Sequence, residues 1–227
     1  MLFRSLVTPK KRILTSIVFF AAFAAGSFGL ELVMEWRVGS DRVLFEERIL
    51  PTETGYTVEL RTSAGEYDEL VLDRSRSTLR WLRRVESEGT ELRAERRGAS
   101  VRVAGKYRGA DYDRTFDLGN LPWYQIQEAS YENLLPERGG IREFWTIDRK
   151  NLRASRFRAE PRGEETIGAM GNAVQALRYD LTVQGVPAFL FTSQLWLRVG
   201  DGRFLRLEVP AILGLPSSSV ELIQEKP

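Results

Sequence analysis

The sequence predicts a mainly β protein: a single antiparallel half-barrel or open β-barrel of about 11 strands or more, covered by one α-helix near residues 121–135. Three observations predict this class. Apolar and polar residues alternate with a period of two along most of the chain after residue 29. Turn-forming residues recur about every ten residues, as in an antiparallel meander. One stretch alone combines helical spacing with helix start and stop signals.

The first half of the chain is predicted to contain eight strands. Between Leu30 and Val38, Leu32, Met34 and Trp36 alternate with polar residues, which predicts a strand with one buried face. Turns such as Gly39-Ser40-Asp41 separate it from the following strands. These further strands are expected at residues 43–49, 56–60, 67–72, 78–86, 91–97, 101–103 and 111–118.

The predicted helix follows these strands. Asn120 suits an N-cap, Pro122 suits the first turn, and Pro136 prevents continuation. Its apolar stripe at helical spacing would have to pack on the sheet, and this stripe is formed by Trp123, Ile126, Ser130 and Leu134.

The second half is predicted to return to strands after Gly139-Gly140. Pro161-Arg162-Gly163 is expected to be a loop, and Gly200-Asp201-Gly202 a hairpin turn. Strands are expected at residues 141–147, 153–160, within 167–183, at 189–199, at 204–209 and at 220–223.

The composition is that of a globular protein, with 227 residues, 43% of them hydrophobic and 28% charged. The formal net charge is +2, but Arg4, Lys10, Lys11 and Arg12 supply the excess. Without them, 29 basic residues face 31 acidic residues, so a nucleic-acid partner is not expected.

Cysteine and histidine are both absent from the sequence. This excludes a cysteine nucleophile, a Ser-His-Asp triad, the usual zinc sites and a histidine general base. It also excludes internal disulfides, so a hydrophobic core and sheet hydrogen bonds must supply the stability. We therefore expect a protein without metal or cofactor.

Residues 1–29 are predicted to be a signal peptide, and residues 30–227 a single β-rich domain. A basic start leads into the apolar run 13–25 and then into small residues. Cleavage is expected after Ser27-Phe28-Gly29 or after Ala22-Phe23-Ala24. The alternative is an uncleaved membrane anchor, for which the apolar run is barely long enough to span a bilayer. The basic residues before the run predict a periplasmic location, or tethering to the inner membrane if the segment is retained.

This layout resembles uncharacterised bacterial envelope domains whose fold is similar to the LolA/LolB lipoprotein-localisation factors. The residues that carry the resemblance are 123–135, Trp145 and the hairpin 196–202, and the resemblance spans most of residues 30–224. It implies an incomplete barrel with a concave apolar cavity. The localisation factors have several helices where this chain has one strong predicted helix. Their functional residues have no identifiable counterparts here, so lipoprotein transport is not carried over.

The aromatic residues and their apolar neighbours have two interpretations. They are either the core of a curved sheet, or the lining of a cavity for an apolar or amphipathic, lipid-like molecule. In an open barrel both can hold, because the core and the cavity wall share a face. The candidate cavity lining comprises Met34, Trp36, Trp123, Ile126, Leu134, Phe189 and Trp196.

Two charged groups of residues are also candidates. The arginine-rich stretch 74–108 could bind anions, but interleaved acids favour cross-strand pairs on a solvated face. Glu128, Glu132, Glu143 and Asp148 could supply the carboxylates of a hydrolase. Glu128 and Glu132, however, lie on the helix face away from Trp123, which predicts solvent exposure and ordinary pKa values.

Taken together, the residues predict a non-enzymatic periplasmic protein that binds an apolar or amphipathic envelope molecule in a concave β cavity. The alternative is an envelope interaction module with a filled barrel, whose exposed edge strand binds a protein partner. A carboxylate-based hydrolase is the third hypothesis.

Overall fold

Fourteen strands form one antiparallel sheet in the computed structural model, which describes residues 29–211 and 216–226. The predicted signal peptide therefore lies outside the described residues, apart from Gly29. The first eight strands are β1 (Leu30–Val38), β2 (Asp41–Pro51), β3 (Gly55–Thr62), β4 (Glu66–Asp73), β5 (Thr78–Val85), β6 (Thr90–Arg97), β7 (Ser100–Tyr107) and β8 (Ala110–Asp117). The last six are β9 (Glu143–Ile147), β10 (Ala154–Ala169), β11 (Asn172–Val183), β12 (Ser193–Arg198), β13 (Phe204–Val209) and β14 (Ser218–Lys226).

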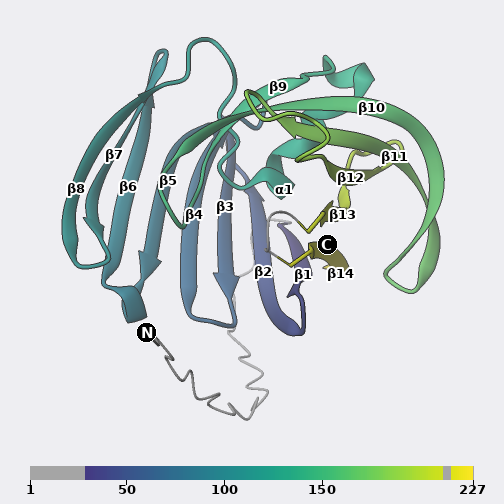
Figure 1. Cartoon of the computed structure of the whole chain (residues 1–227), viewed down its shortest axis with the longest axis horizontal. Coiled ribbons are helices and arrows are strands. Elements are labelled where there is room, and N and C mark those ends of the chain that lie inside the picture. The colour runs from purple at the N-terminus through teal and green to yellow at the C-terminus, as the bar shows by residue number, and fades with distance from the viewer. Residues whose placement is uncertain (1–28, 212–215, 227) are drawn as a thin grey trace, which may run out of the picture.

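The sheet consists of two antiparallel meanders, β1–β8 and β9–β14, which are joined where β1 pairs with β14. Each strand pairs with its neighbour in the chain, except that β1 also pairs with β14 and no direct pair joins β8 to β9. The order therefore runs from β8 down to β1, then from β14 down to β9, and the sheet stays open. Figure 1 shows it curling around the segment that contains α1 (Gln127–Ser130). The predicted open, mainly β half-barrel is confirmed.

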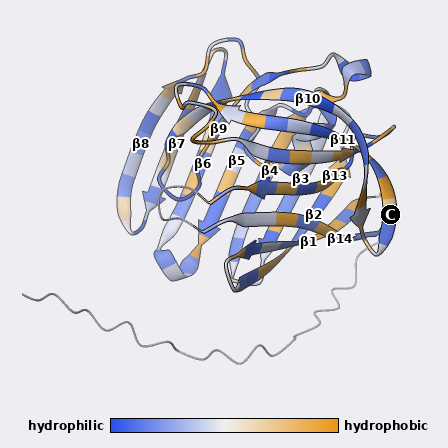
Figure 2. Ribbon diagram, turned by 45° about the vertical axis from the view of Figure 1, so that its right-hand side comes forward, coloured by the Kyte–Doolittle hydropathy of each residue, from blue (hydrophilic) through white to orange (hydrophobic). Residues whose placement is uncertain are grey.

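One face of the curved sheet is buried along its length, and we call it the inner face. In β1 and β2, Leu32 and Met34 lie beside Phe45 and Ile49, and all four are less than 9% exposed. Leu60, Leu70 and Trp81 continue the buried face through β3, β4 and β5. The period-two alternation of the sequence is visible as alternating colours along the strands in Figure 2.

The helix is much shorter than the sequence predicts. Only residues 127–130 are α-helical, and short 3-10 turns follow at η2 (Tyr131–Leu134) and η3 (Pro136–Arg138); one further such turn, η1 (Glu86–Glu88), joins β5 to β6. The expected first turn is extended, because its backbone bonds to the sheet. Trp123 accepts a hydrogen bond from Thr78 N at 2.7 Å, and Tyr124 N donates to Trp145 O at 2.8 Å.

Two predicted boundaries in the second half are also corrected. The loop expected at residues 161–163 is a bulge inside the continuous strand β10, between Pro161 and Gly163. The strand expected from residue 189 begins at Ser193, because residues 184–192 form a loop. The hairpin turn at residues 200–202 joins β12 to β13 as predicted.

Candidate ligand-binding site

The inner face is covered by residues 118–142, which we call the cover. One end of the cover is bound to β5 and β9. Trp123 N donates to Ser77 Oγ at 3.2 Å, and the Trp123 indole N–H donates to Gln125 Oε1 at 2.8 Å. Gln125 in turn donates from Nε2 to Ile147 O at 2.8 Å. These bonds satisfy the buried polar groups of this extended stretch and hold it against the sheet.

Arg76 attaches the middle of the cover to the turn between β4 and β5. Its guanidinium donates to Ala129 O at 3.0 Å and pairs with Glu132 at 2.5 Å. The Ser130 hydroxyl donates to Arg76 O at 2.8 Å, and the guanidinium lies 4.2 Å from the ring centre of Tyr56. Arg76 is 9% exposed, so these contacts form in a largely water-free environment.

Four of the seven predicted lining residues meet in the core between the inner face and the cover. Met34, Trp123, Ile126 and Leu134 are each at most 2% exposed and belong to one hydrophobic cluster. The cover thus fills the space in front of the inner face with its own side chains. Trp36 is half-buried at the margin of this cluster, where Lys150 Nζ lies 4.8 Å from its ring centre.

Phe189 and Trp196, the remaining two predicted lining residues, differ in position. Phe189 is 87% exposed in the loop between β11 and β12, so it does not meet the other six. Trp196 is 6% exposed and belongs to the same hydrophobic cluster, but its indole N–H donates to Glu165 of the long β10–β11 hairpin and its strand partner is Arg206 of β13.

Charged side chains interrupt the apolar inner face, which the sequence analysis did not identify. Asp68 is fully buried in β4 and accepts hydrogen bonds from the Trp81 indole at 2.7 Å and from Arg83 at 2.8 Å. Arg149, from the turn between β9 and β10, reaches the same carboxylate at 3.1 Å. Asp68 is therefore buried with its charge compensated.

Glu47 is the exception among these inner-face charges. It is 0% exposed in β2, and neither carboxylate oxygen has a hydrogen-bond partner among the described residues. Its neighbours across the strands are Leu32 and Leu60, and Phe45 and Ile49 flank it on the same face. Such surroundings disfavour a charge strongly.

Burial and, to a smaller extent, the nearby carboxylate of Glu128 raise the pKa of Glu47 to about 8. Arg76, Arg203 and Arg149 oppose this rise. Near neutral pH the carboxyl group is thus mostly protonated, and it can donate as well as accept a hydrogen bond.

The prediction that Glu128 and Glu132 are solvent-exposed is wrong, and so is the ordinary pKa expected of Glu128. The Glu132 side chain is 15% exposed and pairs with Arg76 and Arg138. Burial raises the pKa of Glu128, although its own backbone N–H and Arg149 oppose the rise. The cause is the shortened helix, which turns these residues inward toward the sheet. Glu143 pairs with Arg156, and Asp148 caps the backbone of its own turn.

Most of the arginine-rich stretch forms exposed cross-strand or neighbouring ion pairs, as predicted. Arg102 pairs with Asp113 and Arg97 with Glu95, and all four side chains are at least half exposed. Arg76 and Arg83 differ, because both lie on the inner side.

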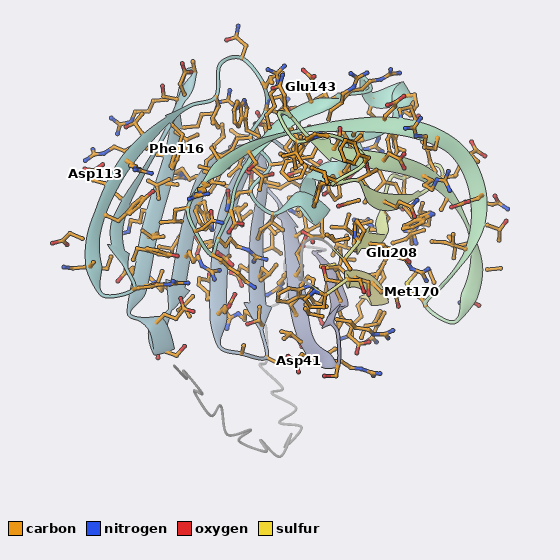
Figure 3. The ribbon with its side chains drawn as sticks, viewed as in Figure 1. Asp41, Asp113, Phe116, Glu143, Met170 and Glu208 are labelled. Carbon is orange, nitrogen blue, oxygen red and sulfur yellow. The ribbon has the colours of Figure 1, made fainter. Side chains whose placement is uncertain are left out.

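Two clefts open elsewhere on the described surface. One, of about 340 Å³, lies between the tip of the β10–β11 hairpin and strands β13 and β14, and Met170, Leu205 and Leu222 help to line it. Figure 3 shows Met170 on this hairpin side of the molecule. The other, of about 590 Å³, lies across β4 to β7 and is bordered by Arg80, Arg93 and Glu69.

Neither a metal cluster nor a membrane-spanning helix was found in the described part of the chain. No group of three or more Asp or Glu side chains there is placed to bind a metal ion. No helix within residues 29–211 and 216–226 has the length and hydrophobicity needed to cross a bilayer.

No family model and no curated protein matches this chain. Solved structures do match, and they include a LolA superfamily protein from Nitrosomonas europaea, with 11% identity over 90% of this chain and 87% of that chain, and a TM-score of 0.26. A DUF1329 family protein from Desulfovibrio piger matches with 11% identity over 88% of this chain and 85% of that chain, and a TM-score of 0.31.

A domain from Vibrio parahaemolyticus that is named for outer membrane lipoprotein sorting matches with 11% identity over 87% of this chain and 84% of that chain, and a TM-score of 0.34. The resemblance predicted from the sequence is thus found among solved structures. At these identities and TM-scores, the matches carry no argument about the ligand or activity of this chain.

Proposed function

We propose that this protein is a non-enzymatic periplasmic protein that binds an amphipathic, lipid-like molecule between the inner face of the sheet and the cover. The apolar part of the molecule would lie along Met34, Leu60 and Leu70, which are fully buried on the inner face. Its polar group would reach the carboxyl group of Glu47.

The observation that carries this proposal is the isolation of Glu47. Buried polar groups in folded proteins almost always have partners, and an unpaired one requires an explanation such as a water, an ion or a ligand. Asp68, the other fully buried carboxylate among the strands of the inner face, accepts hydrogen bonds from Trp81, Arg83 and Arg149. A hydroxyl-bearing ligand would satisfy Glu47 in the same way.

The proposal requires part of the cover to move. Tyr131 and Leu134 are at most 1% exposed, so they occupy the space that the apolar part of a ligand would need. A shift of residues 127–135 would break the contacts of Ala129 and Glu132 with Arg76 and the hydrogen bond from the Tyr179 hydroxyl to Leu134 O.

Bromine quenching of tryptophan fluorescence tests the site directly. Trp81 on the inner face and Trp123 in the cover are each at most 1% exposed. We expect bromododecanol to quench them saturably and small water-soluble bromoethanol to leave them unquenched at equal concentration. Glu47→Leu should weaken binding of bromododecanol by roughly tenfold, which corresponds to one net hydrogen bond. The matched control is Glu46→Gln, at the exposed neighbouring position. Bromododecanol that causes no more quenching than bromoethanol would refute the proposal.

A protein-interaction module remains the second candidate, and the filled interior favours it. The edge of β9 is covered, because Trp123 bridges to Trp145, whereas β8 ends the sheet on the other side. In Figure 3, Asp113 and Phe116 mark this outer edge strand. An extended segment of a partner could add to β8 as a further strand. Wild-type protein that binds no bromododecanol but retains a periplasmic partner in a pull-down would support this alternative.

A further inference from the structure

The loop between β11 and β12 exposes a patch of apolar side chains that neither the core nor the proposed ligand site uses. Phe189 is 87% exposed, and Val186 and Leu190 are 40% and 41% exposed. No residue from 184 to 192 carries a charge. A largely exposed phenylalanine beside two partly exposed aliphatic residues is a candidate interaction surface. We call residues 184–192 the apolar loop.

The apolar loop is a hydrogen-bonded turn that holds Phe189 outward. Val186 N donates to Val183 O at 3.1 Å, and the N–H groups of Leu190 and Phe191 both donate to Pro187 O, at 2.9 and 3.2 Å. The Thr192 hydroxyl donates to Ala188 O at 2.8 Å. Because these bonds satisfy the backbone within the loop, its apolar side chains can enter an apolar environment at little cost.

Two neighbouring segments extend this surface. Gln194 pairs with Glu208, so the start of β12 lies beside the end of β13, where exposed Pro210 and Ala211 follow. On the other side, Gln184 N donates to Arg156 O at 2.8 Å, which places the turn 148–153 at the same end of the sheet. That turn carries the exposed basic side chains of Lys150 and Arg153.

We infer that the apolar loop docks this protein onto an anionic lipid bilayer, with Phe189 inserted among the acyl chains and Lys150 and Arg153 at the headgroups. The uncharged apolar side chains of the loop suit the acyl-chain region of a bilayer, and the basic side chains beside it suit the anionic headgroups. Among the charges of the turn 148–153, Arg149 is paired with Asp68, and the Asp148 carboxylate accepts the N–H groups of residues 150 and 151. Lys150, whose Nζ also lies 4.8 Å from the ring centre of Trp36, and Arg153 are the exposed basic side chains of this turn.

The docking surface lies at the opposite end of the strands from residue 29. Val38 pairs with Ser218, and Val209 also pairs with Ser218, so the apolar loop lies at the C-terminal end of β1. Gly29 precedes the other end of β1. Bilayer contact by Phe189 would thus be separate from any contact made by the N-terminal segment.

A single introduced cysteine can report insertion, because the chain has none of its own. We would label Ala188→Cys, beside Phe189, with an environment-sensitive fluorophore, in protein comprising residues 30–227, which contain the fourteen described strands. The matched control is Ala64→Cys, an exposed alanine in the turn between β3 and β4. Vesicles of phosphatidylcholine, alone or with an equal amount of phosphatidylglycerol, are the probe.

The inference predicts a blue shift at position 188 with the anionic vesicles and none at position 64. Phe189→Ser should weaken vesicle binding by roughly tenfold or more, since a phenylalanine side chain would no longer be buried. Arg153→Gln should weaken binding by about fivefold on anionic vesicles and leave binding to neutral vesicles unchanged. Both substitutions are at exposed positions, so thermal unfolding should be unchanged.

Three results would overturn the inference. The first is the absence of vesicle binding, which would assign the apolar loop to a protein partner instead. The second is binding that Phe189→Ser does not weaken, which would place the contact elsewhere. The third is an equal blue shift at positions 64 and 188, which would indicate non-specific adsorption. All three are independent of ligand binding beneath the cover.

Discussion

Glu47 gives the folded protein a characteristic dependence on pH. A carboxyl group whose pKa is about 8 when folded, against an ordinary value of 4.5, binds a proton more tightly in the folded state. Below the lower value Glu47 is protonated in both the folded and the unfolded state, so it adds no pH dependence to the free energy of unfolding. Between the two values only the folded state holds the proton, so stability falls as the pH rises, by up to about 1.4 kcal/mol per pH unit. Above the upper value both states are ionised, and the free energy of unfolding falls no further on account of Glu47.

We therefore expect Glu47→Gln to flatten the pH dependence of stability. Between about pH 5 and about pH 7.5, the wild type should lose roughly 2–3 kcal/mol of unfolding free energy relative to the variant. Urea unfolding at both pH values measures this difference. Glu46→Gln, at the adjacent exposed position, should parallel the wild type. Equal slopes for wild type and Glu47→Gln would show that Glu47 ionises normally in the folded protein.

Glu47 lies at a position that the alternation of apolar and polar residues marks as buried. Alternation correctly predicted the strand from Val43 through Phe45 to Ile49, and residue 47 occupies the same inward phase. Asp68 and Arg83 likewise occupy inward phases of their strands. A charged residue in the apolar phase of a strand is the signal that could have identified all three. Their partners could not be predicted, because Trp81 and Arg149 reach Asp68 only through tertiary packing.

At the scale of single elements, the cover is a mostly irregular segment rather than the predicted helix. The residues that suggested a helix start, Asn120 and Pro122, instead lead into an extended stretch. Local signals could not show this, because the bonds of Trp123 and Tyr124 are to residues 78 and 145. A strand partner that is remote in sequence outweighs the local helical preference.

Trp123 tests how much the cover contributes to stability. It is 0% exposed, and its indole N–H bonds to Gln125. We expect Trp123→Ala to lower the unfolding free energy by roughly 3–5 kcal/mol, the usual cost of truncating a buried aromatic residue. The half-buried Trp36 provides the comparison, and Trp36→Ala should cost clearly less. Unchanged thermal unfolding of Trp123→Ala would contradict the packing of the cover.

Gly202 tests the contact between the cover and the β12–β13 turn. A Cβ atom there would lie 2.7 Å from Leu135 Cδ1 and 3.0 Å from Glu132 Cα, at a φ of 72°. Gly200 has a φ of 95° and nothing within 4 Å of such an atom. Gly200→Ala should thus cost about 1 kcal/mol from backbone strain. Gly202→Ala should cost roughly 1–3 kcal/mol more from the clash. Equal costs in chemical denaturation would show that the cover does not press on this turn.

At the scale of the whole molecule, the open sheet leaves β8 as an uncovered edge among the described strands. Two copies of β8 could pair edge to edge in an antiparallel arrangement related by a twofold axis. Because the backbone N–H and C=O groups that point away from the sheet belong to alternate residues, the axis would pass between two copies of the same residue. An axis through Asp113 or Arg114, in the middle of β8, would oppose like charges. The charge pattern therefore discourages self-pairing.

This pattern predicts that removing both charges creates an association-prone edge. We expect wild-type protein to stay monomeric and Asp113→Val with Arg114→Val to dimerise or aggregate, as measured by light scattering during size-exclusion chromatography. As a control, Arg93→Val with Arg84→Val removes exposed charges from interior strands of the same sheet. If the control associates as strongly as the β8 variant, surface hydrophobicity rather than the free edge is responsible.

The half-barrel architecture, unlike these local details, follows from the sequence as a whole. Repeated alternation and regular turns predict a meander, and a meander whose inner face is apolar must curl around whatever covers it. The pairing of β1 with β14 could not be predicted, because it joins the two ends of the chain. The sequence predicts Phe189 in a strand that lines the cavity, whereas it lies exposed in a loop. The spacing of apolar residues does not distinguish these two settings.

Native mass spectrometry tests the central claim most directly, with residues 30–227 purified gently from a periplasmic extract. Wild-type protein is predicted to carry a stoichiometric lipid-sized adduct that disappears after extraction with organic solvent. Glu47→Leu, purified in parallel, is predicted to carry much less of the same adduct while remaining folded. A clean mass for wild-type protein that also shows no quenching by bromododecanol would contradict ligand binding beneath the cover.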